Sequence, residues 1–377
     1  MERIYRWLPE LSVMAVLCGM QLHMAWWAAR RSPNRRLWLG AGLLAAWSYF
    51  ALAIALRASR FAPYMDPWWG AWVRGGALMF GFATAVFYAV WWLSVRVERF
   101  SADRRRLLLA TRAAMFGAPL AATGFGIVTS RQFVVREVDL PVQNLPKDLQ
   151  GLRIVQLSDI HLSPFLSERE LAYVVDMAND TRAHLAVLTG DLISGYADPL
   201  EACILQCARL RADAGILGCH GNHEVYAGAI EPATRWGENH GIRFLRHRAE
   251  PLRFGSATLN VAGVDYQRFF HPYLEGAEEL LAPGAVNLLL SHNPDVFPVA
   301  ADQGFHAVLA GHTHGGQVSF EILDRHVNVA RILTPYVYGR YQRGASSLYV
   351  TRGIGTIGMP VRLGAPPEVA LIRLCAT

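Results

Sequence analysis

Long apolar runs dominate the first third of the chain. Three stretches of roughly 20 residues contain no formally charged side chain: Leu11–Ala29, Leu37–Leu56 and Gly75–Val95. Since a membrane-spanning helix needs about 20 apolar residues, this pattern predicts three transmembrane helices. A fourth run, Ala113–Ser130, contains glycines and a proline, which leaves open a further span, a surface segment or an internal export segment. We therefore expect residues 1–130 to form a transmembrane region of three to four helices.

The pattern changes at about residue 131. Residues 131–150 are more polar and contain two prolines, so they are expected to form a linker. In residues 151–377, short runs rich in Val, Ile and Leu alternate with helical patterns. The runs that predict strands are Arg153–Leu157, Leu185–Leu188, Gly215–Gly218, Ala257–Val261, Asn287–Leu290, Ala307–Leu309 and Ser347–Val350. This alternation predicts one α/β domain whose strands are buried on both faces.

Two helix starts can be read from capping residues. Ser167 followed by Glu170 is the pattern of a capping box, which predicts a helix that runs to about Ala178. Asp198 and Pro199 predict the start of a second helix, which we expect to continue through Arg211.

Charge is distributed unevenly along the chain. The net charge of +6 first suggests a nucleic-acid partner, but residues 1–112 hold 15 arginines and only five acidic residues, whereas residues 113–377 are mildly acidic. The basic residues are concentrated in the loops that follow the first and third apolar runs. By the positive-inside rule these loops face the cytoplasm, and no nucleic acid is expected as a partner.

This charge pattern also predicts a location. If Ala113–Ser130 crosses the bilayer, the remaining domain lies outside. We expect an integral protein of a bacterial inner membrane, with its C-terminal domain on the outer, periplasmic side and with the lipid bilayer as its partner. No obligate protein partner is evident from the sequence.

Polar side chains gather directly after five of the predicted strands. The segments concerned are Ser158–His161, Thr189–Asp191, His220–Glu224, Ser291–Asp295 and Gly311–Gly316. In α/β sheets, ligands bind at the carboxyl ends of parallel strands. Carboxylate, amide and imidazole groups suit hard or borderline divalent cations, and Asp191 in its Gly-Asp turn could bridge two of them. Two ions about 3.5–4 Å apart can hold a phosphoryl group and activate a water, which points to a phosphoesterase.

These segments contain the motifs DxH, GD, GNH(D/E), H and GHxH, in this order. In this pattern the chain resembles the calcineurin-like metallophosphoesterase family, from about Gly151 to Leu374. The resemblance implies a four-layer α/β sandwich of two mixed sheets flanked by helices. It also implies two divalent ions (Mn, Fe or Zn) and a hydroxide between them that attacks phosphorus.

The resemblance also implies roles for single residues. The first ion would be held by Asp159, His161, Asp191 and His314, and the second by Asp191, Asn222, His292 and His312. His223 would act as general acid or contact the phosphate, with Asn222 counted beside it as catalytic and Glu224 orienting it. Arg352 and Arg362 are candidates for substrate binding through their forked donors, and solvated loop charge is the alternative for both.

A narrower resemblance concerns the substrate. The segments IVQLSDIHL, GHTHGGQ and VRLGAPPEV, after an apolar N-terminal region, are similar to the membrane-anchored YkuE/YaeI type of the family and to animal transmembrane metallophosphoesterases. Relatives of that type include phosphodiesterases that act on UDP-2,3-diacylglucosamine, a lipid A precursor. We therefore expect a lipid-linked or nucleotide-lipid substrate. The alternatives are a non-catalytic membrane scaffold, and a phosphodiesterase or nuclease that acts on soluble substrates.

Overall fold

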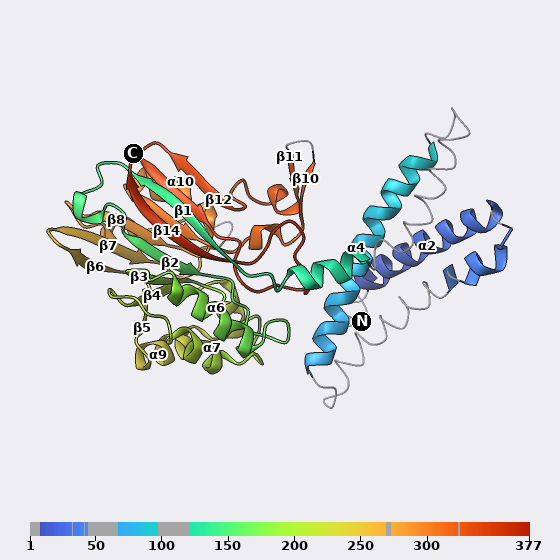
Figure 1. Ribbon diagram of the computed structural model, residues 1–377, viewed down its shortest axis with the longest axis horizontal. Coiled ribbons are helices and arrows are strands. Elements are labelled where there is room, and N and C mark those ends of the chain that lie inside the picture. Colours follow the sequence, from blue (N-terminus) through green and yellow to red (C-terminus); the bar gives the residue numbers. More distant parts are fainter. Residues whose placement is uncertain are drawn as a thin grey trace. The chain divides into compact units, whose positions relative to one another are not determined.

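The computed structural model describes residues 8–31, 33–40, 42–43, 67–96, 121–268, 273–322 and 325–377 (Figure 1). The chain divides into two compact units. The first comprises Met1–Val128 and Gly358–Val361, and the second comprises Thr129–Ile357 and Arg362–Thr377.

The described residues before Thr129 are mainly helical. Helix α2 (Leu8–Arg31) contacts helix α4 (Pro67–Arg96) through both hydrogen bonds and aromatic rings. Nδ1 of His23 lies 2.7 Å from the hydroxyl of Tyr88, and the His23 ring meets Trp91 edge-on with ring centres 5.3 Å apart. The polar side chain of His23 is therefore partnered on the neighbouring helix.

The predicted spans fall on these helices only in part. Leu11–Ala29 lies within α2 and Gly75–Val95 within α4. Most of Leu37–Leu56 and the first half of Ala113–Ser130 lie outside the described residues, as do most of the arginines after the third run, while residues 121–129 are helical. Within the described ranges, no helix combines the length and the apolar character that crossing a membrane requires.

The second unit is built on two mixed sheets of six strands each. The first sheet has the order β1 (Val134–Val142), β14 (Glu368–Ala376), β2 (Arg153–Leu157), β3 (Leu185–Thr189), β4 (Ile216–Cys219) and β5 (Ile242–Phe244). The second has the order β12 (Gly339–Arg343), β13 (Ser346–Val350), β9 (Ala307–Ala310), β8 (Val286–Leu290), β7 (Ala257–Gly263) and β6 (Arg248–Phe254). Strands β2 to β5 are parallel to one another, and so are β7, β8, β9 and β13. A separate hairpin pairs β10 (Ser319–Ile322) with β11 (Arg325–Asn328).

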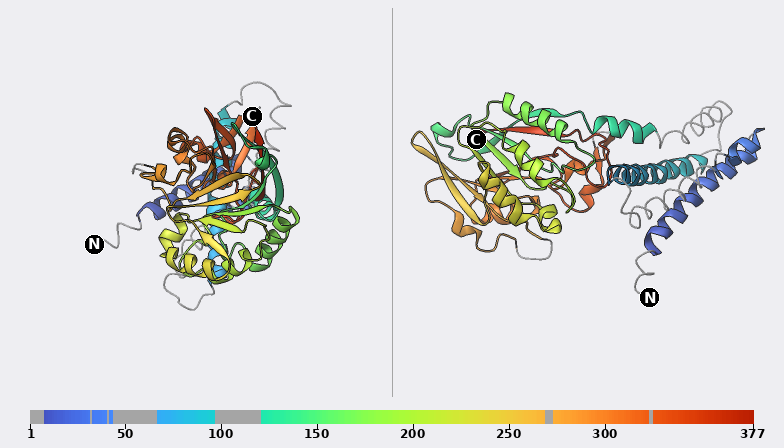
Figure 2. Two further views of the ribbon diagram at one scale, coloured as in Figure 1. Left: turned by 90° about the vertical axis from the view of Figure 1, so that its left-hand side faces the viewer. Right: turned by 90° about the horizontal axis from the view of Figure 1, so that it is seen from below.

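Helices cover the outer face of each sheet. On the first sheet lie α6 (Glu168–Asp180), α7 (Leu200–Cys207) and α9 (Ile230–Asn239), and on the second lies α10 (Phe297–Gln303), while the short α8 (Asn222–Ala227) follows β4 (Figures 1 and 2). Five single 3₁₀ turns are described: η1 (Lys147–Leu149), η2 (Ala277–Leu280), η3 (Pro294–Val296), η4 (His314–Gly316) and η5 (Val329–Ile332). The predicted arrangement of two mixed sheets flanked by helices is thus present.

A further apolar layer lies between the two sheets. In β2, Val155 packs with residues of the covering helices, whereas its neighbour Ile154 packs with Val187 of β3 and with Leu288 of the second sheet. Because side chains alternate along each strand, a central strand contributes to two cores. This explains why these strands read as continuous apolar runs in the sequence.

All seven predicted strands are present, with ends that differ by up to two residues. The segment 131–150, predicted as a linker, instead contains β1, which pairs in parallel with β14. Most of its residues are at least partly exposed because it is an edge strand, and an edge strand lacks the apolar run of a central one.

The predicted helix starts are also present. The capping box of Ser167 and Glu170 is formed on both sides, and α6 begins directly after it. Helix α7 begins after Pro199 but ends at Cys207, one turn before the predicted Arg211.

Candidate metal centre

The five polar segments converge at one edge of the sandwich. Three follow β2, β3 and β4 of the first sheet, and two follow β8 and β9 of the second. Within each sheet these strands are parallel, so their carboxyl ends lie side by side. The contact of His292, after β8, with the carbonyl oxygen of Thr189, in β3, joins the two sets.

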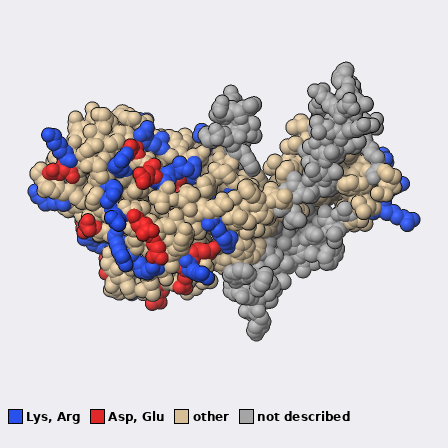
Figure 3. All heavy atoms as spheres, viewed as in Figure 1, with Lys and Arg blue, Asp and Glu red and all other residues tan. Residues whose placement is uncertain are grey.

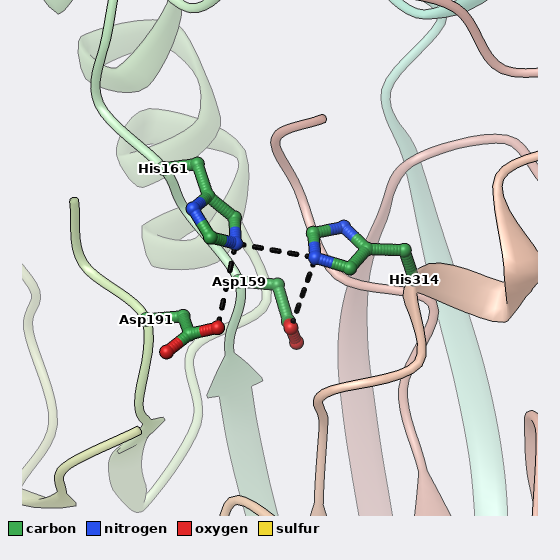
Figure 4. A group of neighbouring side chains, drawn as sticks. All are labelled: Asp159, His161, Asp191 and His314. Atoms are coloured by element: carbon green, nitrogen blue, oxygen red, sulfur yellow. Dashed lines mark hydrogen bonds and ion pairs between the residues drawn. The ribbon is translucent and has the colours of Figure 1, made fainter. Parts of the chain in front are cut away.

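The first group of side chains contains Asp159, His161, Asp191 and His314. One potential ligand atom of each lies within 4.8 Å of those of the others, and all four side chains are buried. Figure 4 shows their polar ends facing one another. Nε2 of His161 lies 3.1 Å from Nε2 of His314 and 3.5 Å from Oδ2 of Asp191, and Nε2 of His314 lies 3.4 Å from Oδ1 of Asp159. Four donor atoms therefore surround one small space.

The second group contains Asp191, His292 and His312, with the same spacing limit. Nε2 of His292 lies 3.1 Å from Oδ2 of Asp191, and its Nδ1 lies 2.7 Å from the carbonyl oxygen of Thr189, which only accepts. This hydrogen bond places the proton of a neutral ring on Nδ1 and leaves the Nε2 lone pair free. The two groups share Asp191.

The electrostatics of both groups favour a bound cation. Burial raises the pKa of Asp159 and lowers the pKa of His312 to about 3. Burial also acts to lower the pKa of His292, but the carboxylates of Asp191 and Asp159 outweigh it and raise that pKa to about 10. A divalent cation would offset the buried carboxylates and use the imidazole lone pairs.

Asn222 provides an independent test of whether these residues suit bound metal ions. Its Oδ1 atom is buried and has no hydrogen-bond partner, an arrangement that costs free energy unless the oxygen has another ligand. Together with the donor set of the two groups, this oxygen makes the residues compatible with a binuclear centre of divalent metal ions.

The backbone that carries these side chains is strained. Ten described non-glycine residues have a positive φ, and five of them belong to the two groups, with φ between 47° and 76°: Asp159, His161, Asp191, His312 and His314. Such conformations cost free energy and persist where surrounding structure fixes them, typically at functional sites.

Close backbone packing accompanies this strain. A Cβ atom on Gly221 would overlap the carboxylate of Asp191, and one on Gly311 would overlap the side chains of Ser158 and Asp159. Glycine is therefore required at both positions to let the turns approach the carboxylates.

Comparison with known proteins identifies this arrangement. Residues 152–316 match the family described as calcineurin-like phosphoesterase. The chain carries a calcineurin-like metallophosphoesterase domain. This family assignment makes it a hydrolase of phosphoester bonds.

Several relatives share this domain. The uncharacterized metallophosphoesterase YkuE of Bacillus subtilis is 29% identical over 69% of this chain and 93% of its own length. A Danio rerio protein named "transmembrane protein with metallophosphoesterase domain" is 28% identical over 66% of this chain, which spans 59% of that relative's length. Among solved structures, the crystal structure of TT1561 from Thermus thermophilus covers 54% of this chain and 91% of its own at 14% identity, with a TM-score of 0.37.

In the calcineurin-like domain, His223 is held beside the first group. Its Nδ1 lies 2.7 Å from the carbonyl oxygen of Ser194, and its backbone N–H donates to Oδ1 of Asp191 at 2.9 Å. The ring of His223 meets that of His161 edge-on, with centres 4.7 Å apart. The side chain is thus oriented with Nε2 available for a ligand.

Glu224 has a different role from the predicted one, which was to orient His223. Its buried carboxylate does not orient the His223 ring. It accepts hydrogen bonds from the backbone N–H groups of Gly221, Asp191 and Leu192, at 2.7, 2.9 and 2.7 Å. Glu224 therefore ties the turn after β4 to the turn after β3.

The two candidate substrate-binding arginines differ in their surroundings. The guanidinium of Arg352 lies 4.4 Å from the ring centre of Tyr338, and its side chain is largely buried. Arg362 is fully buried, and its guanidinium donates to the backbone carbonyl groups of His314, Arg352, Gly355 and Ala365. The predicted phosphate contact of Arg362 gains no support, because these bonds direct its donors to the backbone.

Ser194 is a site residue that the sequence analysis missed. Its hydroxyl lies 3.0 Å from Nδ1 of His161, and its carbonyl oxygen holds Nδ1 of His223. The residue lies outside all five motif segments, so no spacing in the sequence indicates it.

Proposed function

We propose that this chain is a membrane-anchored, metal-dependent phosphoesterase that acts on an amphiphilic phosphate ester or diphosphate. A nucleotide-lipid such as UDP-2,3-diacylglucosamine is the substrate class we favour, and Mn, Fe or Zn are the proposed ions. The observation that carries the proposal is the pair of ligand groups that share Asp191.

The ligand assignment follows from the two groups. Asp159, His161, Asp191 and His314 would hold one ion, while Asp191, Asn222, His292 and His312 would hold the other. When bound, two such ions lower the pKa of a coordinated water and offset the negative charge of a phosphoryl group.

His223 is proposed as the general acid. A carbonyl oxygen only accepts hydrogen bonds, so the contact with Ser194 fixes a proton on Nδ1 of His223. The second ring nitrogen, Nε2, can then hold the proton that the departing oxygen receives, or contact a phosphate oxygen. Asn222 directly precedes it at the start of α8, so metal ligand and proton donor sit on one turn.

Exposed apolar side chains support the membrane part of the proposal. On α2 and α4, large side chains such as Val16, Trp26, Val90 and Leu93 are between 45% and 57% exposed. An apolar surface of this kind is suited to lipid. The name of the Danio rerio relative agrees with a membrane anchor. The arginine-rich loops support the periplasmic side as the location of the catalytic domain.

A nuclease would require a basic groove for the phosphate backbone. On the face drawn in Figure 3, basic and acidic side chains are interspersed over the second unit. Residues 113–377 as a whole hold more acidic than basic residues, which favours a small or lipid-linked phosphate over a polynucleotide.

The test uses the full-length chain in mixed micelles with Mn²⁺. Hydrolysis of bis-p-nitrophenyl phosphate is compared between the wild type, Asp191→Ala, Asn222→Ala and the exposed control Asp176→Ala. We expect activity in the wild type and the control and its collapse in the other two. Equal activity in all four chains would reject the proposal, and a preference for UDP-glucosamine lacking acyl chains over UDP-2,3-diacylglucosamine would reject its lipid part.

A further inference from the structure

Arg362 joins three segments of the second unit through one guanidinium group. Nη1 donates to the carbonyl oxygen of His314 at 3.1 Å, to that of Arg352 at 2.6 Å and to that of Ala365 at 3.3 Å. Nη2 donates to the carbonyl oxygen of Gly355. One side chain thus connects the turn that carries His314 to the loop after β13.

The loop after β13 in turn holds the first ligand turn. The backbone N–H of Gly355 donates to the carbonyl oxygen of Asp159 at 2.7 Å, and that of Ile354 donates to the carbonyl oxygen of Ser158 at 3.1 Å. A Cβ atom on Gly353 would overlap the side chain of Asp159, and one on Gly355 would overlap the carbonyl group of Ile160. The position of Asp159 and His161 therefore depends on this loop.

These contacts form one continuous path. His161 and His314 are 153 positions apart in the sequence, and their Nε2 atoms face the same space. The path runs from His314 through the guanidinium of Arg362 to Gly355, and from there by a backbone hydrogen bond to Asp159. It connects the backbones of two of the three turns that supply the first ligand group, those of Asp159 and His314.

We propose that Arg362 is a positioning residue that sets the distance between the Asp159–His161 turn and His314, and so selectively determines the affinity of the first metal ion. This inference rests on the proposed function, because it requires that the two ligand groups hold ions. In the second group, His292 lies off this path, because it follows β8 and is fixed by the Thr189 carbonyl. His312 meets the path through its backbone N–H, which donates to the carboxylate of Asp159 at 2.9 and 3.1 Å. The direct hydrogen bonds of Arg362 and Gly355 go to the turns of the first group.

Arginine suits this position better than lysine does. Its planar fork presents several donors in fixed directions, whereas a lysine ammonium offers a single point with a flexible stem. The buried positive charge is offset by Asp159 and Glu368, which act against the effect of burial on the pKa of Arg362, lowered to about 10. Arg362→Lys therefore retains the charge and removes the geometry.

The test is a Mn²⁺ titration of the metal-free full-length chain, with bound metal counted by elemental analysis and the pair followed by electron paramagnetic resonance. We expect two ions in the wild type. In Arg362→Lys, one ion should bind about 10- to 100-fold more weakly, and the signal of a coupled Mn pair should give way to that of an isolated ion. The control Arg373→Lys, at an exposed arginine paired with Asp139, should bind as the wild type does.

A double variant identifies which ion is affected. In a His161→Ala background, Arg362→Lys should cause no further loss, because the ion that it affects is already weakened. In a His292→Ala background, it should weaken the ion that remains.

The possible results distinguish a failure of the inference on Arg362 from a failure of the proposed function. Two tightly bound ions in a folded Arg362→Lys chain would overturn the inference alone, as would equal weakening of both ions. Failure of Arg362→Lys and Arg362→Met to fold would overturn it in favour of a purely structural role. A wild type that binds no ion would instead reject the proposed function.

Discussion

The Nε2 atoms of His161 and His314 lie 3.1 Å apart, with carboxylate oxygens of Asp191 and Asp159 within 3.5 Å of one or the other. Two neutral imidazoles can meet in this way only if one donates a proton to the other, or if both direct lone pairs at a cation. The surrounding carboxylates favour the cation. The arrangement is therefore compatible with a divalent metal ion held between these side chains.

Metal removal should therefore destabilise the second unit. We expect a lower Tm in EDTA and its recovery with Mn²⁺, because a ligand that binds only the folded state adds about 2.7 kcal/mol at a concentration 100-fold above its Kd. Thermal unfolding with and without chelator measures this. The Tm of Asp191→Ala should hardly respond to Mn²⁺, and an equal response in both chains would contradict the assignment of Asp191 as the shared ligand.

Replacement of His223 should have an effect that depends on the leaving group. For an alkyl phosphodiester, His223→Ala should lower kcat by about 10²- to 10⁴-fold, as expected for loss of a general acid. For bis-p-nitrophenyl phosphate the loss should be much smaller, because p-nitrophenolate departs without a proton. Steady-state kinetics on both substrates gives the comparison, and equal losses would exclude a role as general acid. Bound metal should stay at the wild-type level.

Gly221 should tolerate no side chain. Gly221→Ala places a Cβ atom against the carboxylate of Asp191, so we expect loss of both metal binding and hydrolysis. Gly195→Ala is the matched control, because a Cβ atom there meets nothing within 4 Å. Metal content and activity of the two purified chains provide the measurement. Wild-type metal content in Gly221→Ala would show that the turn can move without harm.

Glu224→Gln should destabilise the fold and loosen the metal centre together. The amide group would direct an N–H donor at a backbone N–H, leaving buried donors unpaired at a cost of about 1–3 kcal/mol. Urea unfolding of the metal-free chain measures the loss, and Glu201→Gln at an exposed position is the control. An unchanged midpoint would contradict the tie between the two turns.

The sequence was most informative where the chemistry is local. Central strands such as β3 are buried on both faces, so each appears in the sequence as a continuous apolar run. Residues that commonly bind metal ions, such as Asp159 and His161, directly follow a strand of this kind. Edge strands are harder to predict from the sequence. Strand β1 is at least partly exposed along most of its length, and its polar residues are typical of a linker. Its stability comes from β14, a partner that no local pattern reveals.

Tertiary contacts explain the remaining differences. Ser194 acts through its position opposite His161 and His223, and such a contact leaves no spacing in the sequence. Arg352 and Arg362 are both candidates from the sequence because of their forked donors, which could reach a phosphate. In the structure Arg362 is fully buried, and sequence alone does not reveal this burial. The positive φ angles of five candidate ligands are likewise imposed by the assembled turns and not by residue type.

The pairing of β1 with β14 also bears on when the domain can fold during synthesis. Asp139 and Arg373 lie opposite each other in this pairing although 234 positions separate them. The first strand of the sheet therefore leaves the ribosome long before its neighbour in the sheet does. A nascent chain that stops short of Glu368 lacks the strand between β1 and β2, so translation through β14 is a condition for the finished sheet.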